Sequence, residues 1–357
     1  MTDYTRRAFL RRAAAGLGTL TGGWLLTACA GEPLTTIAPS RTPRRAETST
    51  PVPSTAQAHT SESPSPTTTT GEPEVATPAP TPEPTAAHAD LVVARSGEPE
   101  QLVRRALAAL GGMERFVKPG DDVVVKPNIC VAYHTYEYAA TTNPWVVGAL
   151  VRLALEAGAA RVRVMDYPFG GSAEQAYVKS GIQEQVQAAG GQMEVMTKFK
   201  FIDTEIPEGL DLQQCRIYDG VLQADVLINV PIAKHHSLAR LTLAMKNLMG
   251  VIWDRPAMHR DLGQRLADLS SRVYPTLTVV DAVRMLMNHG PTGGNLDDVK
   301  QLDTVIATAD IVAADSYAAT LYGMRPEDLA FVRKGAEMGL GRSELSKLKI
   351  EEINVGG

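Results

Sequence analysis

Cysteine is scarce in this sequence, with only Cys29, Cys130 and Cys215 among 357 residues. Three cysteines are too few for the disulfide framework that stabilises small secreted domains. They are also too few, and too far apart in the chain, to ligate an iron–sulfur cluster or a zinc ribbon by themselves. We therefore expect no iron–sulfur cluster from this chain, and the identity of any other cofactor stays open.

Positive charge is lacking over most of the chain. The net charge is −5 at pH 7, and residues 1–28 carry four arginines and one aspartate, a net +3 that leaves −8 on all the other residues. General affinity for nucleic acid depends on a basic face that neutralises phosphates. The acidic remainder of the chain therefore argues against a nucleic-acid partner.

Aromatic side chains are absent from residues 31–90, which instead hold 12 of the 23 prolines, 14 threonines and 6 serines. Such a segment cannot bury enough apolar surface to offset the entropy lost on ordering, and its proline tracts favour extended polyproline II. We predict a disordered tether over 29–90. The region 91–357 that follows is long enough for one large domain or two closely packed lobes.

The N-terminus has no apolar run long enough for a stable membrane-spanning helix, because the stretch 13–28 has 16 residues and a span needs about 20. TRRAFLR at 5–11 resembles a twin-arginine export signal, and LTAC at 26–29 resembles a lipobox. We predict a twin-arginine lipoprotein signal peptide over 1–28 and acylation of Cys29. The protein would then be exported and lipid-anchored to the outer face of the cytoplasmic membrane or the cell envelope. The alternative is an ordinary N-terminal anchor with an incidental cysteine.

Strand and helix patterns alternate through 91–357. Short apolar runs typical of buried strands occur at 121–128, 161–166, 224–231, 277–281 and 304–308. Asn143 and Pro144 supply an N-cap and a first-turn proline for a helix that ends near Gly158, and another helix is expected over 310–322. The alternation predicts an α/β fold with a mainly parallel sheet and helices on both faces.

Polar side chains lie where these expected strands end. The strand ends carry Lys126, Asn128, Asp166, Asn229 and Asp281. In doubly wound sheets the carboxyl ends of the strands meet at one edge, where ligands bind. Two further segments add cations and amides to that edge, KHH at 234–236 and KN at 246–247.

Two hypotheses account for this set of residues. In a ligand hypothesis, Lys234 and His236 are catalytic, with His236 as the general acid or base. The residues expected to bind an anionic ligand are Lys126, Asn128, Lys246, Asn247, Asp281, Gly290, Gly293 and Gly294. The glycines form a turn whose amides can line an anion. In the competing hypothesis the lysines belong to a salt-bridged core, neutralised by Asp166, Asp281 and Asp315 without any ligand.

Taken together, several segments are similar to the motifs of one family. They are VKPN at 125–128, TTNP at 141–144, DVLINVP at 225–231, KHH at 234–236, LAMKNLMG at 243–250, VVDA at 279–282, GPTGG at 290–294, ADIVAAD at 309–315 and GLG at 339–341. The chain resembles the domain of unknown function 362 family over nearly all of 91–357. His235 stands where the family usually has threonine.

The resemblance implies little about the reaction. Many members of the family look like iron–sulfur proteins because a ferredoxin-like module is attached to them, and this chain has no such module. A role in electron transfer would therefore need a separate redox partner protein.

Three functions fit the sequence, and whether the protein is an enzyme stays open among them. The first is a membrane-tethered extracytoplasmic protein that binds, or also transforms, an anionic small molecule at the Lys/His/Asn site. The second is a divalent-metal protein, because imidazole and carboxylate groups are apt ligands. The metal ligands would be His236, Asp281, His289 and Asp315. The third is a lipoprotein that captures a ligand or a protein partner without catalysis.

Overall fold

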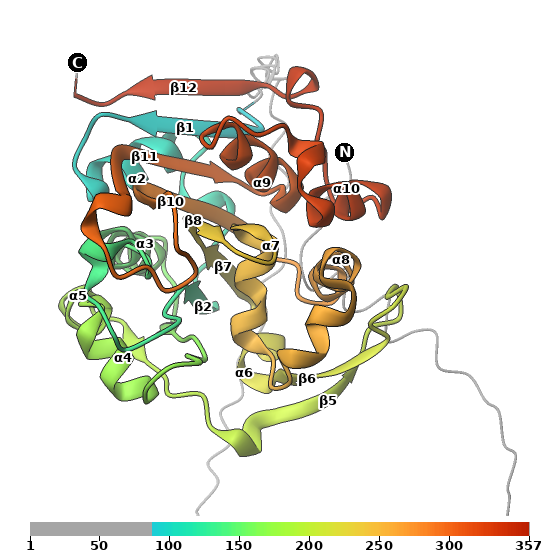
Figure 1. The fold of residues 1–357 in the computed structure, drawn as a ribbon. Coiled ribbons are helices and arrows are strands. Elements are labelled where there is room, and N and C mark those ends of the chain that lie inside the picture. The colour runs from blue at the N-terminus through green and yellow to red at the C-terminus, as the bar shows by residue number, and fades with distance from the viewer. Residues whose placement is uncertain (1–87, 357) are drawn as a thin grey trace, which may run out of the picture. The chain divides into compact units, whose positions relative to one another are not determined.

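The computed structural model describes residues 88–356, which Figure 1 draws in colour. The expected signal peptide at 1–28, the acylation site Cys29 and nearly all of the expected tether lie outside the described residues. Within 88–356, no helix combines the length and the apolar character needed to cross a membrane.

A ten-stranded sheet runs through the described residues, and most of its strand pairs are parallel. Its main path is β12-β1-β11-β10-β7-β2-β3-β4, with β8 paired to β10 and β9 paired to β8. These strands are β1 (Leu91–Arg95), β2 (Asp122–Pro127), β3 (Arg161–Val164), β4 (Gln192–Met193), β7 (Val226–Val230), β8 (Ile232–His236), β9 (Arg240–Thr242), β10 (Leu277–Leu286), β11 (Val299–Thr308) and β12 (Ile350–Asn354). The α/β fold with a mainly parallel sheet is confirmed.

Hydrophobic side chains pack on both faces of the sheet. In β2, Val124 belongs to one hydrophobic cluster, whereas Val123 and Val125 belong to the other, because successive strand residues point to opposite faces. A near-continuous apolar run such as VVV is what a strand buried on both faces requires.

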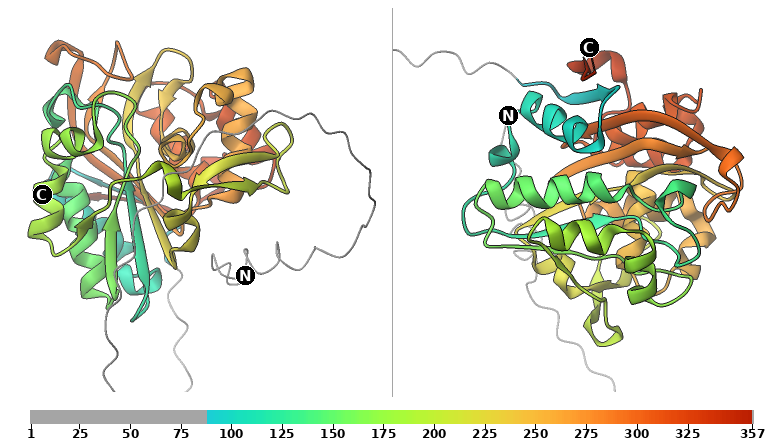
Figure 2. Two further views of the ribbon diagram at one scale, coloured as in Figure 1. Left: turned by 90° about the horizontal axis from the view of Figure 1, so that it is seen from below. Right: turned by 90° about the vertical axis from the view of Figure 1, so that its left-hand side faces the viewer.

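Helices cover both of these faces, as expected, and Figure 1 shows the two groups on opposite sides of the sheet. One group consists of α2 (Pro99–Ala109), α3 (Pro144–Glu156), α4 (Ala173–Lys179) and α5 (Ile182–Ala188). The other consists of α6 (Asp219–Gln223), α7 (Ala244–Asn247), α8 (Leu262–Arg272), α9 (Ile311–Thr320) and α10 (Ala330–Glu337). A separate hairpin of β5 (Phe201–Glu205) and β6 (Gln214–Tyr218) packs on the second group and extends away from the main sheet (Figure 2).

The expected helix starts are present with their caps. The side chain of Asn143 accepts a hydrogen bond from the Trp145 amide at 3.0 Å, and Pro144 is the first residue of α3. Asp310 caps α9 by accepting from the Ala313 amide at 2.8 Å. Both caps satisfy amides that have no partner inside the first turn of a helix.

Two strands differ from the sequence expectation in ways that move site residues. β10 continues to Leu286, because the AVRML sequence after Asp281 is again apolar, and it pairs antiparallel with β11. Asp281 therefore lies within a strand and not at its end. The segment containing Lys234 and His236 follows the strand expected over 224–231 and forms a strand of its own, β8, parallel to β10.

Candidate functional site

A cavity of about 60 Å³ lies at the carboxyl ends of β2, β3 and β8, against α7. That volume holds an anion of a few heavy atoms, since one buried water needs about 10–15 Å³. Six of the residues expected at the site line this cavity: Lys126, Asn128, Lys234, His236, Lys246 and Asn247. Residues from three separate segments of the sequence thus meet at one place, as the topology of the sheet predicts.

Lys126 forms a buried ion pair at this cavity. Its Nζ lies 2.9 Å from Asp166 Oδ1 and donates to Asn247 Oδ1 and to the Pro127 carbonyl, at 2.9 Å each. The second oxygen of Asp166 accepts from the Ile129 amide at 2.5 Å. Burial lowers the pKa of Lys126, and the charge of Asp166 opposes that shift. The ammonium thus donates to two protein acceptors and faces one carboxylate.

Gly250 makes room for this ion pair. A Cβ atom at residue 250 would lie 1.9 Å from Asp166 Oδ1 and 2.5 Å from Lys126 Nζ, which is well inside van der Waals contact. Any side chain would therefore push the paired groups apart. This close approach explains the glycine at the end of the KNLMG motif, and its backbone conformation does not itself require glycine.

Three asparagines join the elements around the ion pair. Asn128 Nδ2 donates to Asn247 Oδ1 at 2.9 Å. Asn247 Nδ2 donates to Asn229 Oδ1 at 2.9 Å and to the Lys126 carbonyl at 3.2 Å, and Asn229 Nδ2 donates to the Ala244 carbonyl at 3.0 Å. This chain of hydrogen bonds links β2, β7 and α7, so it fixes the cavity wall.

The ammonium group of Lys234 faces only acceptors of the protein. Its Nζ lies within hydrogen-bond distance of Asn128 Oδ1 at 3.0 Å, Cys130 Sγ at 3.2 Å, the Ala140 carbonyl at 2.6 Å and the Pro291 carbonyl at 2.9 Å. An ammonium has three N–H bonds, so four acceptors leave none for a ligand. The geometry favours a positioning role for Lys234 over proton donation in catalysis.

Lys246 differs from the other two lysines. It is half-buried on α7 and lines the cavity, yet its ammonium has no hydrogen-bond or ion-pair partner among residues 88–356. Burial, with the charges of Lys234, Arg255 and Lys126, lowers its pKa from 10.5 to about 8. Lys246 is therefore the lysine of this cavity that has donors free for a ligand.

His236 is neutral at physiological pH. Its Nδ1 accepts hydrogen bonds from the Leu238 and Ala239 amides at 3.1 and 3.3 Å. Burial and the nearby charges of Lys246 and Lys234 lower its pKa to about 3. With Nδ1 occupied as an acceptor, the proton resides on Nε2. At neutral pH His236 is thus placed to donate a hydrogen bond, and its low basicity does not favour the expected acid–base role.

The cavity also contains residues that the sequence reasoning did not select. Arg255 donates to the Met249 carbonyl at 3.1 Å and to the Tyr167 carbonyl, and lies 4.8 Å from the centre of the Tyr167 ring. Burial lowers its pKa. Thr242 is 3 % exposed, and its Oγ1 has no hydrogen-bond partner among the described residues. Neither belongs to a motif that signals a site.

Asp281 and Asp315 do not line the cavity. Asp281 accepts from the Asn143 amide at 2.7 Å and from the Val283 amide at 3.0 Å. Asp315 accepts from the amides of residues 244 and 245, at 2.5 and 3.0 Å, and so anchors the first turn of α7. Burial raises their pKa values to about 6 and about 7, respectively. Of the three carboxylates expected to neutralise the lysines, only Asp166 pairs with one.

The glycine-rich turn contributes a carbonyl to the cavity and not its amides. Among the lining residues it is represented by Pro291. The Gly290 amide donates to His235 Nδ1 at 3.1 Å, and the Gly293 amide donates to the His289 carbonyl at 3.1 Å. The expected glycines that do not line the cavity are Gly290, Gly293 and Gly294. The amides of Gly290 and Gly293 therefore bind protein acceptors and do not face the cavity, unlike the expected anion contact.

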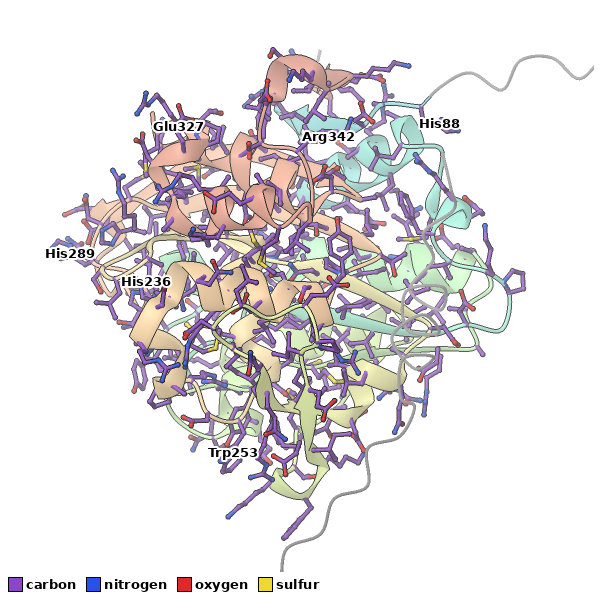
Figure 3. All side chains as sticks on the ribbon, turned by 90° about the vertical axis from the view of Figure 1, so that its right-hand side faces the viewer. His88, His236, Trp253, His289, Glu327 and Arg342 are labelled. Atoms are coloured by element: carbon purple, nitrogen blue, oxygen red, sulfur yellow. The ribbon has the colours of Figure 1, made fainter. Side chains whose placement is uncertain are left out.

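The four residues proposed as an alternative metal site are not brought together. His289 pairs with Asp298 at 2.8 Å, its side chain is 79 % exposed, and it lies at the edge of the molecule in Figure 3. Asp281 and Asp315 bind backbone amides elsewhere, which leaves His236 alone at the cavity. Over residues 88–356, no group of three or more His, Cys, Asp or Glu side chains is placed to hold a metal ion.

Comparison with known proteins places this site within a family. Residues 123–320 match the family model described as Domain of unknown function (DUF362), and every residue that lines the cavity lies in that range. A thylakoid-associated protein of Synechocystis sp. is 26% identical over 247 residues, which cover 67% of this chain and 74% of that protein.

Two solved structures are distantly similar to the chain. The lactate racemase apoprotein from Thermoanaerobacterium thermosaccharolyticum matches with a TM-score of 0.42 and 11% identity, over 64% of this chain and 56% of that one. A protein from Thermotoga maritima matches with a TM-score of 0.39 and 12% identity, over 64% and 60%. The chain thus spans less than two thirds of either structure, and the likeness is too distant to support an argument about function.

Proposed function

The chain belongs to the family described as Domain of unknown function (DUF362), and we propose that it is an exported, membrane-tethered protein that binds an anionic small molecule in the cavity around Lys246. The anionic group is a carboxylate or a phosphate. The observation that carries this proposal is the Lys246 ammonium, which lines the cavity without a partner among the described residues.

The charge of the cavity supports an anionic ligand. Lys126, Lys234, Lys246 and Arg255 line it together with a single carboxylate, that of Asp166, in a chain of net charge −5. Like charges near a protein surface repel by about 1–4 kcal/mol per close pair. A bound anion offsets that repulsion, and it does so most strongly at Lys246, which has no carboxylate of its own.

The free donors of the cavity support the same ligand. Lys246 supplies three N–H bonds, and His236 supplies Nε2–H. Thr242 adds a buried hydroxyl that lacks a partner. Buried polar groups without partners are rare and unfavourable in folded proteins, so a ligand that satisfies several of them at once gains affinity. The oxygens of a carboxylate or phosphate match this set of donors.

Two observations support the membrane part of the proposal. The sequence carries the twin-arginine motif and the lipobox that ends at Cys29, and the curated relative from Synechocystis sp. is named as thylakoid-associated. Cys29→Ala should release the protein from the membrane fraction of its host or stall its processing. Unchanged fractionation and processing of the variant would contradict the lipid anchor.

Native mass spectrometry of protein purified from its own host tests the ligand directly, because a retained anion adds its mass to the intact protein. Titration with inorganic phosphate at constant ionic strength tests it without a retained ligand. Wild type should gain thermal stability with phosphate, and Lys246→Met should not. Lys179→Met, which removes an exposed lysine of α4, is the matched control and should respond like wild type. Equal responses of all three proteins would refute the binding site.

A further inference from the structure

We propose that the Lys246 amine forms a covalent imine with the carbonyl carbon of a 2-oxo acid held in the cavity. This inference rests on the proposed function, because the carboxylate of the 2-oxo acid is the anion that the cavity binds. It adds a chemical class of substrate and a bond-forming residue to that function.

The first argument is the contrast among the three lysines. An amine attacks a carbonyl only through a free lone pair on nitrogen. Lys126 pairs with Asp166 and donates to an asparagine and a carbonyl, and Lys234 faces four acceptors. Both amines are therefore held by acceptors of the protein. Lys246 lines the same cavity without an acceptor among residues 88–356, so nothing holds its proton in place.

The second argument is the surroundings of Lys246. Its neighbours are cations, and burial together with their charges lowers its pKa to about 8. At pH 7 roughly one tenth of the amine is then uncharged and nucleophilic. Desolvation next to another cationic group is the general way in which a lysine becomes a Schiff-base nucleophile.

The third argument is that the cavity can hold the other end of a 2-oxo acid. Arg255 uses Nε and one terminal nitrogen on carbonyl groups, and its other terminal nitrogen has no partner among the described residues. Thr242 presents an unpartnered hydroxyl. These groups suit the carboxylate of a 2-oxo acid, and they line the same cavity as Lys246. Phosphate shares the anionic contact but has no carbon for the amine to attack.

The step balances without any oxidant or further reactant. The lone pair of Lys246 Nζ forms the C–N bond while the π electrons of the carbonyl move to its oxygen, which takes up a proton. The C–O bond of this carbinolamine then breaks, and the oxygen leaves as water with the proton lost from nitrogen. The products are one imine and one water. The protonated imine draws electrons from the neighbouring carbon and so activates its bonds.

Reductive trapping tests the inference. The purified full chain is incubated with pyruvate and then with sodium borohydride, which converts an imine to a stable secondary amine and adds about 72 Da to the protein. We expect one adduct, located on Lys246 by peptide sequencing, and none when pyruvate is omitted. Trapping should fall about tenfold or more in Lys246→Met and be unchanged in Lys179→Met. Added phosphate should slow it.

Two results would overturn the inference. One is an adduct that persists in Lys246→Met. The other is no adduct in wild type. If pyruvate then still stabilises wild type but not Lys246→Met, the anion site stands and the covalent step fails. If neither pyruvate nor phosphate stabilises wild type, the proposed function fails with it.

Discussion

Replacing Lys246 by methionine should stabilise the protein and abolish anion binding in the same variant. Methionine keeps an unbranched side chain of similar length and removes the charge. The pKa of Lys246 in the folded protein is about 8, against 10.5 for the ordinary side chain. Because one pKa unit corresponds to 1.36 kcal/mol, the buried ammonium destabilises the fold by about 3 kcal/mol at most. Partial exposure to solvent reduces this, so a gain of about 1–3 kcal/mol is expected.

The sign of the pH dependence follows from the same shift. Below pH 8 the ammonium is present in both the folded and the unfolded chain, and the penalty is complete. Between pH 8 and 10.5 the unfolded chain binds more protons than the folded chain, so stability rises with pH and the penalty disappears. Lys246→Met should therefore exceed wild type in stability at pH 7 and approach it near pH 10.

Urea denaturation and thermal melting in phosphate-free buffer measure this difference. At about 2–4 °C per kcal/mol for a domain of roughly this size, the melting temperature at pH 7 should rise by several degrees. Phosphate should then raise the melting temperature of wild type but not that of the variant, and Lys179→Met should match wild type in both tests. A variant that is less stable than wild type at pH 7, or that still responds to phosphate, would refute the reasoning.

Three further predictions concern the residues that build the cavity. Lys126→Met leaves the Asp166 carboxylate buried without its partner and should cost about 3–5 kcal/mol of stability in urea denaturation; a loss below about 1 kcal/mol would contradict the ion pair. Gly250→Ala places a Cβ atom 1.9 Å from Asp166 Oδ1, so it should lower both the melting temperature and the phosphate response. A variant with an unchanged melting temperature and response would show that residue 250 does not lie so close to the Lys126–Asp166 ion pair. Asp315→Asn should flatten the pH dependence of stability. Burial raises the pKa of Asp315 from 3.8 to about 7. Between about pH 4 and 7 the folded protein therefore binds more protons at this carboxyl than the unfolded chain does, so the free energy of unfolding falls as the pH rises. The same slope in variant and wild type would exclude this origin.

The convergence of these residues on one cavity could be predicted from the sequence, because it depends on topology. Apolar runs at 121–128, 161–166 and 224–231 predict parallel strands, and parallel strands bring their carboxyl ends to one edge. Lys126 therefore meets Asp166 although the two are distant in the chain, whereas Lys246 reaches the cavity from α7. The antiparallel β10–β11 pair could not be found in this way, since an apolar run does not encode its direction.

The roles of the individual side chains could not be predicted, because they depend on atomic partners. Asp281 and Asp166 both appeared to end a strand, but only Asp166 faces a lysine. Asp281 lies within a longer strand and binds backbone amides. Likewise, nothing in the order of residues distinguishes the saturated Lys234 from the unpartnered Lys246. A sequence motif can indicate which side chains lie near one another. The number of hydrogen-bond acceptors around each side chain can be found only from the three-dimensional structure.

The arrangement of the three lysines explains how an acidic protein keeps a cationic cavity. Burying a lysine is unfavourable unless its donors are satisfied, and Lys126 and Lys234 meet that condition entirely with protein atoms. Their positions are therefore fixed before any ligand arrives, so these two groups need no reorganisation when an anion binds. The neighbouring charges and burial lower the pKa of Lys246, and its N–H donors have no acceptor among the described residues. The proposed anion binding and the proposed imine formation therefore both depend on this single residue.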